Sequence, residues 1–294
     1  MFKGVLTALI TPFKDNKIDF RSLEVLIEKQ LTAGVSGFVV LGTTAETPAL
    51  NEQEKEEIIK FCTEKINKRA KIIIGTGANN TQTMLKNCEV ASKYNPDALL
   101  IVTPYYNKPN LSGMIAHYTL ASQFNKPIVL YHIPGRTGQK LSVKFFEELL
   151  NNVPQIMAVK ESCYDITHLT EMSVKFAQKR LEYICGNDDL WPVFLGLGSR
   201  AIISAAANTM APFFVKVYNL FTEGKTQEAM SVFAQGYSLI KANYAEVNPT
   251  CAKYLLSLMG LASDEVRLPL GFISEENKIF LKQIYEQTPK DILL

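Results

Sequence analysis

Short apolar runs recur along the whole chain and alternate with longer amphipathic stretches. Each run is continuous and rich in Ile, Val and Leu, a pattern that indicates parallel strands buried on both faces. The expected strands cover residues 5–10, 37–41, 72–74, 98–102, 128–131, 156–160, 183–185 and 201–204. Eight such strands with interleaved helices predict an α/β fold, a (β/α)8 TIM barrel.

The first connection between strand and helix argues against the doubly wound alternative. A doubly wound nucleotide-binding sheet would carry a glycine fingerprint there, whereas this turn reads TPFKDNK. The first helix is expected over residues 20–33, with Gly34 as its stop. Asn51 is expected to cap the second helix, with Glu54 as the reciprocal partner of a capping box.

About 90 residues follow the eighth expected strand, and their pattern is helical only. Helices are expected near 211–222, 226–242, 249–259 and 274–287. We predict a barrel over residues 1–224 and a C-terminal helical region over 225–294. Because no Gly/Ser-rich or Pro-rich linker separates them, we expect the helical region to pack on the barrel.

Charge and hydropathy narrow the classes of function. The 294 residues hold 31 Lys plus Arg and 29 Asp plus Glu, a net charge of +2 with no basic block. This balance argues against nucleic acid or an anionic membrane as a partner. No apolar run reaches the ~18 residues that a membrane span needs. The short apolar N-terminus is interrupted by Pro12 and is interpreted as a buried strand, not a signal peptide.

Cysteine and histidine usage predicts neither disulfides nor a metal site. The five cysteines are odd in number and lack CxxC spacing, which favours reduced thiols in a cytoplasmic protein. The histidines at positions 117, 132 and 168 stand far apart and form no recognisable ligand motif.

Polar residues concentrate where the expected strands end, which is where active sites of barrels lie. Lys160 ends the apolar run 156–159, so its amine is expected to point into the barrel. Burial favours the neutral amine, which can attack a carbonyl group. Thr43, Thr44, Tyr131 and Arg136 lie at or just after the ends of other expected strands.

Each of these residues also has an ordinary structural interpretation. Lys160 could pair with Glu161 or lie at the rim of the barrel, and Tyr131 could be a core aromatic with a bonded hydroxyl. Arg136 could be a solvated side chain, although its planar fork also suits a substrate carboxylate. Thr43 and Thr44 could simply begin a helix.

Several segments in order resemble the dihydrodipicolinate synthase / N-acetylneuraminate lyase family. They are TALITPF near the start, GTTAE at 42–46, YHIPGRTG at 131–138, KES at 160–162 and RLPLG at 267–271. The resemblance implies a class I aldolase-type barrel, usually a homotetramer built as a dimer of dimers. It also implies that no metal or organic cofactor is needed.

The resemblance assigns roles to individual residues. Lys160 would form an imine with pyruvate. Tyr131, Thr44 and Tyr106 match the proton-relay triad of the family, with Tyr106 reaching in from a neighbouring subunit. The remaining matches concern substrate binding: the amides of Thr43 and Thr44 for the pyruvate carboxylate, Ile203 for the pocket wall, and Arg136 for the carboxylate of aspartate semialdehyde.

The implied activity is the condensation of pyruvate with aspartate 4-semialdehyde in lysine and diaminopimelate biosynthesis. Two departures bear on this. Ala45 stands where the family usually has glycine, which would cost about 1 kcal/mol if the position needs a positive φ. His132 stands where these synthases usually have asparagine. The alternatives are a pyruvate aldolase acting on another aldehyde, of the 2-keto-3-deoxy sugar acid or sialic acid type, and a non-catalytic binding relative.

The resemblance also bears on regulation. Lysine-inhibited members hold the ammonium group of the inhibitor with a histidine and a glutamate, and these positions are Lys55 and Thr83 here. Asn79 and Tyr105, which match the groups that hold the carboxylate of the inhibitor, are retained. A chain that lacks the anion and gains a cation is expected to be insensitive to lysine.

Overall fold

The computed structural model describes residues 2–177 and 181–294, and their strands form the predicted barrel. Within these residues, eight parallel strands follow one another in the order β1-β10-β9-β8-β7-β6-β5-β4. The strands are β1 (Gly4–Ala8), β4 (Gly37–Val40), β5 (Lys71–Gly75), β6 (Ala98–Val102), β7 (Ile128–His132), β8 (Ile156–Glu161), β9 (Glu182–Cys185) and β10 (Ala201–Ser204). The predicted fold class is confirmed, and each expected strand lies within two residues of an observed one.

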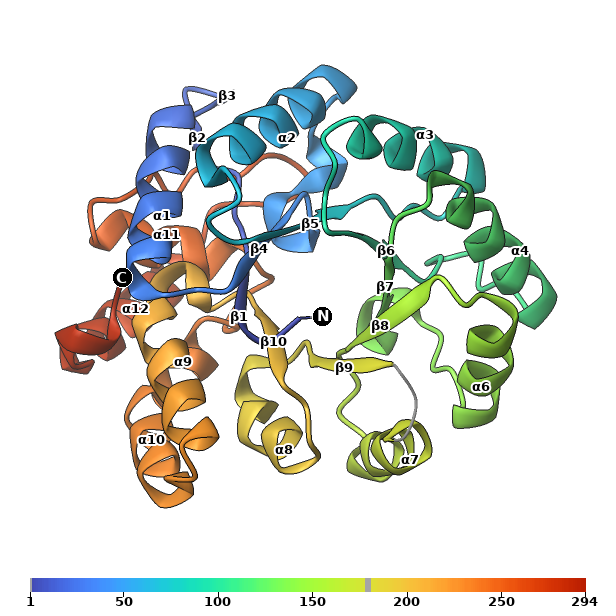
Figure 1. The fold of residues 1–294 in the computed structure, drawn as a ribbon. Coiled ribbons are helices and arrows are strands. Elements are labelled where there is room, and N and C mark those ends of the chain that lie inside the picture. The colour runs from blue at the N-terminus through green and yellow to red at the C-terminus, as the bar shows by residue number, and fades with distance from the viewer. Residues whose placement is uncertain (1, 178–180) are drawn as a thin grey trace. The chain divides into compact units, whose positions relative to one another are not determined.

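One compact unit contains Ile72–Ile202 together with the first residues of the chain. Strands β6, β7, β8 and β9 pair in register here, and helices lie outside them (Figure 1). These helices are α3 (Thr81–Ser92), α4 (Leu111–Ala121), α5 (Pro134–Thr137), α6 (Val143–Asn152), α7 (Ile166–Phe176) and α8 (Trp191–Gly196). The strands are buried because helices cover their outer face and side chains fill the inner one.

The second compact unit contains Gly4–Lys71 and Ile203–Leu294. Its helices are α1 (Phe20–Ala33), α2 (Glu52–Ile66), α9 (Ala207–Thr222), α10 (Thr226–Ala242), α11 (Thr250–Leu258) and α12 (Glu275–Gln287). Helix α9 contacts β1, and α10 packs against α9 and α12. Gly236 permits the close approach of α10 to α9, since a Cβ there would lie 2.5 Å from the Phe213 ring. The proposed boundary at residue 224 stays a prediction.

Capping residues explain why the first helices begin and end where the sequence predicts. The Asp19 carboxylate accepts the Ser22 N–H, and Gly34 ends α1 in the left-handed conformation at φ 88°. Asn51 and Glu54 form the predicted capping box at the start of α2.

A small antiparallel ribbon after β1 was absent from the predicted strands. It pairs β2 (Phe13–Lys14) with β3 (Lys17–Ile18) through a two-residue turn. Asp15 and Asn16 both adopt positive φ, at 53° and 58°, as a hairpin turn of this length requires. The ribbon is too short for the alternation of side chains to reveal it.

Two further features concern thiols and membrane spans. All five cysteines are free and buried. In the part of the chain that the structure describes, no helix combines the length and the apolar character needed to cross a bilayer.

The buried His117 of α4 makes stability dependent on pH. Its Nδ1 lies 3.0 Å from Thr81 Oγ1, and burial lowers the pKa of His117 to about 4. Between pH 6.5 and 4 the unfolded chain therefore binds a proton that the folded chain does not. As the pH falls through this range, the free energy of unfolding is expected to drop by about 3 kcal/mol because of His117 alone.

The variant His117→Gln cannot titrate, so its stability should depend less steeply on pH. Urea unfolding gives the free energy of unfolding of each protein at pH 7 and at pH 4.5. The loss between the two pH values is then compared between wild type and variant, so that the contributions of other groups cancel. Equal losses of stability in wild type and variant would contradict the assignment.

Candidate active site

Lys160 and Tyr131 lie side by side near the carboxyl ends of two neighbouring strands. They are register partners in the β7–β8 ladder, so their side chains project from the same face. The Lys160 side chain is buried, and its Nζ lies 4.1 Å from the centroid of the Tyr131 ring. The prediction that the strand carries this amine into a buried position is confirmed.

Glu161 does not pair with Lys160, and the lysine is buried and not at an exposed rim, so neither structural interpretation considered for the lysine holds. Successive residues of a strand point to opposite faces, so Glu161 faces the helices while Lys160 faces the other way. In residues 2–177 and 181–294, Lys160 forms no ion pair with a carboxylate. The amine therefore lies beside an aromatic ring without a neutralising partner.

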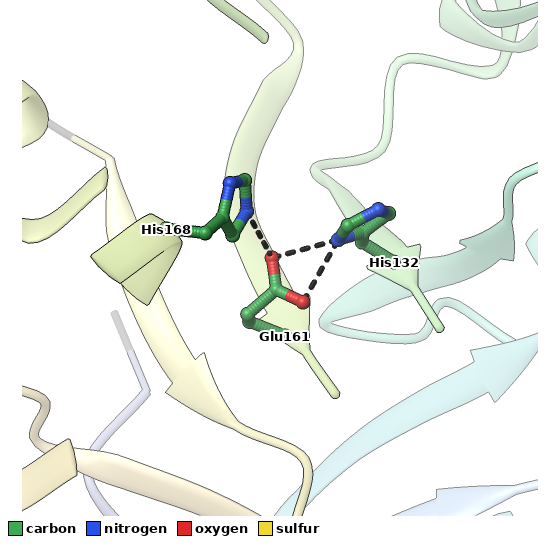
Figure 2. A group of neighbouring side chains, drawn as sticks. All are labelled: His132, Glu161 and His168. Atoms are coloured by element: carbon green, nitrogen blue, oxygen red, sulfur yellow. Dashed lines mark hydrogen bonds and ion pairs between the residues drawn. The ribbon is translucent and has the colours of Figure 1, made fainter. Parts of the chain in front are cut away.

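The Glu161 carboxylate instead meets two of the three histidines (Figure 2). Both of its oxygens lie 2.8 Å from His132 Nδ1, and Oε2 lies 3.5 Å from His168 Nε2. Although burial opposes ionisation, hydrogen bonding to His132 and His168 holds the pKa of Glu161 below its usual range. His132 and His168 are far apart in the sequence, and the fold brings them together at one carboxylate.

The alternation of side chains along the strands could have predicted that Glu161 and His132 meet. A glutamate that follows an inward-facing lysine must face the helix layer, where an anion needs a partner. His132 follows Tyr131 in the same manner, and the register pairs it with Glu161. His168 enters from α7, and no sequence spacing predicts that contact.

Arg136 lies on the short helix α5 after β7 and is exposed. The next residues turn sharply, with Gly138 in the left-handed conformation at φ 69°. The loop then returns to the strand, where the Leu141 N–H donates to His132 Nε2 at 3.1 Å. The guanidinium fork is therefore carried on a turn whose far end is tied down.

Tyr106 lies in the loop after β6, with its side chain 90% exposed. Its backbone adopts a left-handed conformation, with φ 71°. The neighbouring Asn107 secures the loop, because its Nδ2 donates to the Asn79 carbonyl at 2.8 Å. A tyrosine held in this manner presents its ring outward from its own chain.

Thr43 and Thr44 form the 3-10 turn η1 (Thr43–Ala45), which directly follows β4 in the second unit. Thr43 is exposed and Thr44 is buried. Ala45 lies within the turn, and the left-handed residue is Glu46, with φ 54°. Position 45 does not need a positive φ, so alanine does not carry the free-energy cost that a left-handed conformation would impose there. Ile203 is buried in β10.

Asn248 contacts a predicted site residue, Thr44, and the sequence analysis missed it. Its Nδ2 donates to Thr44 Oγ1 at 2.9 Å, across 204 residues of sequence. Because the amide group is the donor, Thr44 keeps its own hydroxyl proton for another acceptor. Asn248 precedes α11, and only its polar character at a helix start could have drawn attention to it.

A buried ion pair supports the loop that carries these threonines. The Glu46 carboxylate pairs with Lys253 and accepts the Arg267 N–H at 2.9 Å. Burial lowers the pKa of Lys253 to about 8, against the raising effect of Glu46. Phe13 contacts both cations, with Lys253 Nζ 4.0 Å and Arg267 Cζ 4.3 Å from its ring centroid.

The strand order defines a closed barrel of parallel strands, and one of these strands ends with a buried lysine, Lys160. The model of the dihydrodipicolinate synthetase family matches residues 1–288. The chain belongs to this family, and the resemblance found in the sequence is confirmed.

Individual relatives are similar over nearly their whole length. The 4-hydroxy-tetrahydrodipicolinate synthase of Endomicrobium trichonymphae is 37% identical over 284 residues, which cover 96% of this chain and 97% of that protein. The crystal structure of dihydrodipicolinate synthase from Thermotoga maritima matches with a TM-score of 0.94 and 33% identity, covering 98% of each chain. A monomeric dihydrodipicolinate synthase variant matches with a TM-score of 0.94 and 34% identity, covering 97% of this chain and 96% of its own.

Proposed function

We propose that this chain is a 4-hydroxy-tetrahydrodipicolinate synthase, which condenses pyruvate with aspartate 4-semialdehyde through an imine on Lys160. The observation that carries the proposal is the buried amine of Lys160 beside Tyr131, at the end of β8 in a chain of this family. The pathway served would be lysine and diaminopimelate biosynthesis.

The chemistry begins at Lys160. Its neutral amine attacks C2 of pyruvate, and loss of water gives the imine. Removal of a proton from C3 gives an enamine, whose C3 attacks the aldehyde carbon of the second substrate. The amino group of that substrate then attacks C2, which closes the ring and releases the lysine amine. Each step balances without a metal or an organic cofactor, and none is proposed.

Proton transfer is assigned to three hydroxyl groups, those of Tyr131, Thr44 and Tyr106. The ring of Tyr131 contacts the reacting amine, and its hydroxyl group is proposed to relay protons as the imine forms. Asn248 fixes the Thr44 oxygen as an acceptor, which directs the threonine proton elsewhere. Tyr106 is largely exposed on its own chain, which suits a residue that completes the site of a neighbouring subunit.

Substrate carboxylates are assigned to groups that suit their charge. The backbone amides of Thr43 and Thr44 would bind the pyruvate carboxylate, and Ile203 would line its pocket. Arg136 would bind the carboxylate of aspartate semialdehyde through its planar fork.

The proposed functional form is a homotetramer, built as a dimer of dimers, in the cytoplasm. In each chain we propose a barrel over residues 1–224 and a helical region over residues 225–294.

The runner-up is a pyruvate aldolase that uses a different aldehyde, and a non-catalytic binding relative is the third candidate. A coupled assay with pyruvate and a panel of aldehydes distinguishes them. Turnover confined to aspartate semialdehyde supports the proposal, whereas preference for a sugar-derived aldehyde favours the runner-up. Absence of both turnover and imine formation would leave only the binding role.

The Asn248 contact predicts a modest catalytic effect. Asn248→Asp keeps the shape of the side chain but removes the N–H donor to Thr44 Oγ1. We expect kcat to fall by about tenfold, the equivalent of one hydrogen bond. Asn152→Asp makes the same chemical change at an exposed helix end and is the control. An unchanged kcat in Asn248→Asp would show that the contact does not orient Thr44.

The proposed function also predicts insensitivity to lysine. Lys55 on α2 and Thr83 on α3 occupy the positions that hold the ammonium group in inhibited relatives. A lysine near that group repels it, at a cost of roughly 1–4 kcal/mol for charges about 4 Å apart. We expect L-lysine at millimolar concentration to leave the coupled assay unaffected. Half-inhibition below about 1 mM would show that another anion binds the inhibitor.

A further inference from the structure

The His132 imidazole uses both of its ring nitrogens, and each contacts a different part of the predicted active site. Nε2 accepts the Leu141 N–H at 3.1 Å, so Nε2 carries a lone pair and no proton. The ring proton therefore resides on Nδ1, which donates to Glu161 at 2.8 Å. The ring is completely buried and packs edge-on against Phe146 at 5.1 Å between centroids. A single orientation and tautomer are thereby fixed.

The two hydrogen-bond partners of His132 lie in the segments that carry Lys160 and Arg136. Glu161 follows Lys160 on β8, and its Oε1 also accepts the Cys163 N–H at 2.7 Å, so the strand end is held from both sides. Leu141 ends the loop that follows the Arg136 turn. His132 itself follows Tyr131. One side chain thus joins the segment of the nucleophile to the segment of the carboxylate-binding arginine.

The same three side chains could be interpreted as a metal site, because their ligand atoms lie within 4.8 Å of one another (Figure 2). The tautomer argues against that interpretation. A metal at the centre of the cluster would need the lone pair of His132 Nδ1, but that nitrogen carries the proton as long as Leu141 donates to Nε2. The cluster therefore acts through hydrogen bonds.

We propose that His132 is a positioning residue for the second substrate. It fixes the distance between the Lys160 strand and the Arg136 turn, and so favours an aldehyde whose carboxylate stands at a matching distance from its reacting carbon. This inference rests on the proposed function, since it assumes that Lys160 and Arg136 act on one pair of substrates. His132 touches neither substrate and acts through Glu161 and Leu141.

Two variants separate the two contacts of the imidazole. His132→Asn places an amide near the position of Nδ1, so it can still donate to Glu161 but no longer reaches Leu141. His132→Gln reaches as far as Nε2, so it can accept from Leu141 but withdraws the donor from Glu161. His168→Asn is the control, because it removes the other imidazole at Glu161 and leaves both contacts of His132 in place.

The full-length proteins are compared in four measurements: the KM for each substrate, the rate of borohydride trapping with pyruvate, amide hydrogen exchange at Leu141, and thermal stability. For His132→Asn we expect the KM for aspartate semialdehyde to rise about tenfold and exchange at Leu141 to accelerate by a similar factor. The KM for pyruvate and the trapping rate should stay within about twofold. His132→Gln should show slow exchange at Leu141 and a KM for aspartate semialdehyde near the wild-type value. His168→Asn should match wild type in that KM and in exchange.

The outcomes distinguish the two levels of inference. If His132→Asn accelerates exchange at Leu141 but leaves the KM for aspartate semialdehyde unchanged, the contact exists and the positioning role is wrong. If both His132 variants only lower the thermal stability, with both KM values unchanged, His132 is structural and the proposal fails. If wild type does not turn over aspartate semialdehyde at all, the proposed function fails and this inference fails with it.

Discussion

Borohydride added with pyruvate should leave a single covalent adduct on the wild-type chain, at Lys160, and none on the Lys160→Ala variant. Lys160 is buried beside Tyr131 and forms no carboxylate pair within the described residues, so no ion pair has to be broken before its amine attacks a carbonyl group. An exposed lysine stays protonated and attacks a carbonyl slowly. Loss of the nucleophile should lower kcat by roughly a thousandfold or more.

Intact mass and peptide mapping identify the modified residue. Lys144→Ala is a matched control, because this lysine lies on α6 with 85% of its side chain exposed and should not carry the adduct. An adduct on another lysine, or its absence in wild type, would remove the aldolase proposal and favour the binding relative.

Arg136→Ala should weaken the use of aspartate semialdehyde by about a hundredfold in kcat/KM while pyruvate trapping continues. The guanidinium is exposed in the free protein, so it is available to pair with an incoming carboxylate. Loss of a charge-assisted, two-pronged contact costs about 3 kcal/mol, which corresponds to that factor.

Arg136→Lys is the informative companion, because it keeps the positive charge and loses the planar fork. An intermediate value of kcat/KM would show that geometry contributes beyond charge. If Arg136→Ala handles aspartate semialdehyde like wild type, the carboxylate binds elsewhere and the sugar-acid alternative becomes the better proposal.

The sequence predicted the strands well because each is a continuous apolar run bounded by polar residues. A local signal also located the end of α1, since Gly34 acts on the residues immediately before it. The inward direction of Lys160 followed from the same reasoning, because a charged residue that ends a buried run is positioned by its strand.

Contacts between distant segments were beyond such reasoning. The hydrogen bond from Asn248 to Thr44 spans 204 residues and depends on how α11 is placed. The meeting of His168 with Glu161 depends in the same way on where α7 lies relative to β8. Periodicity describes which face of an element is buried, but it does not identify the residue that the face meets.

The contacts of Glu46 with the C-terminal part of the chain have a consequence for the synthesis of the protein on the ribosome. Its partner Lys253 is added about 200 residues after the loop of Thr43 and Thr44, and the Arg267 amide follows later still. On a ribosome, β1, β4 and α1 emerge long before either partner exists. The loop assigned to pyruvate binding therefore gains its final contacts only as translation nears its end, so a nascent or C-terminally shortened chain lacks the support that the finished chain gives to its threonines.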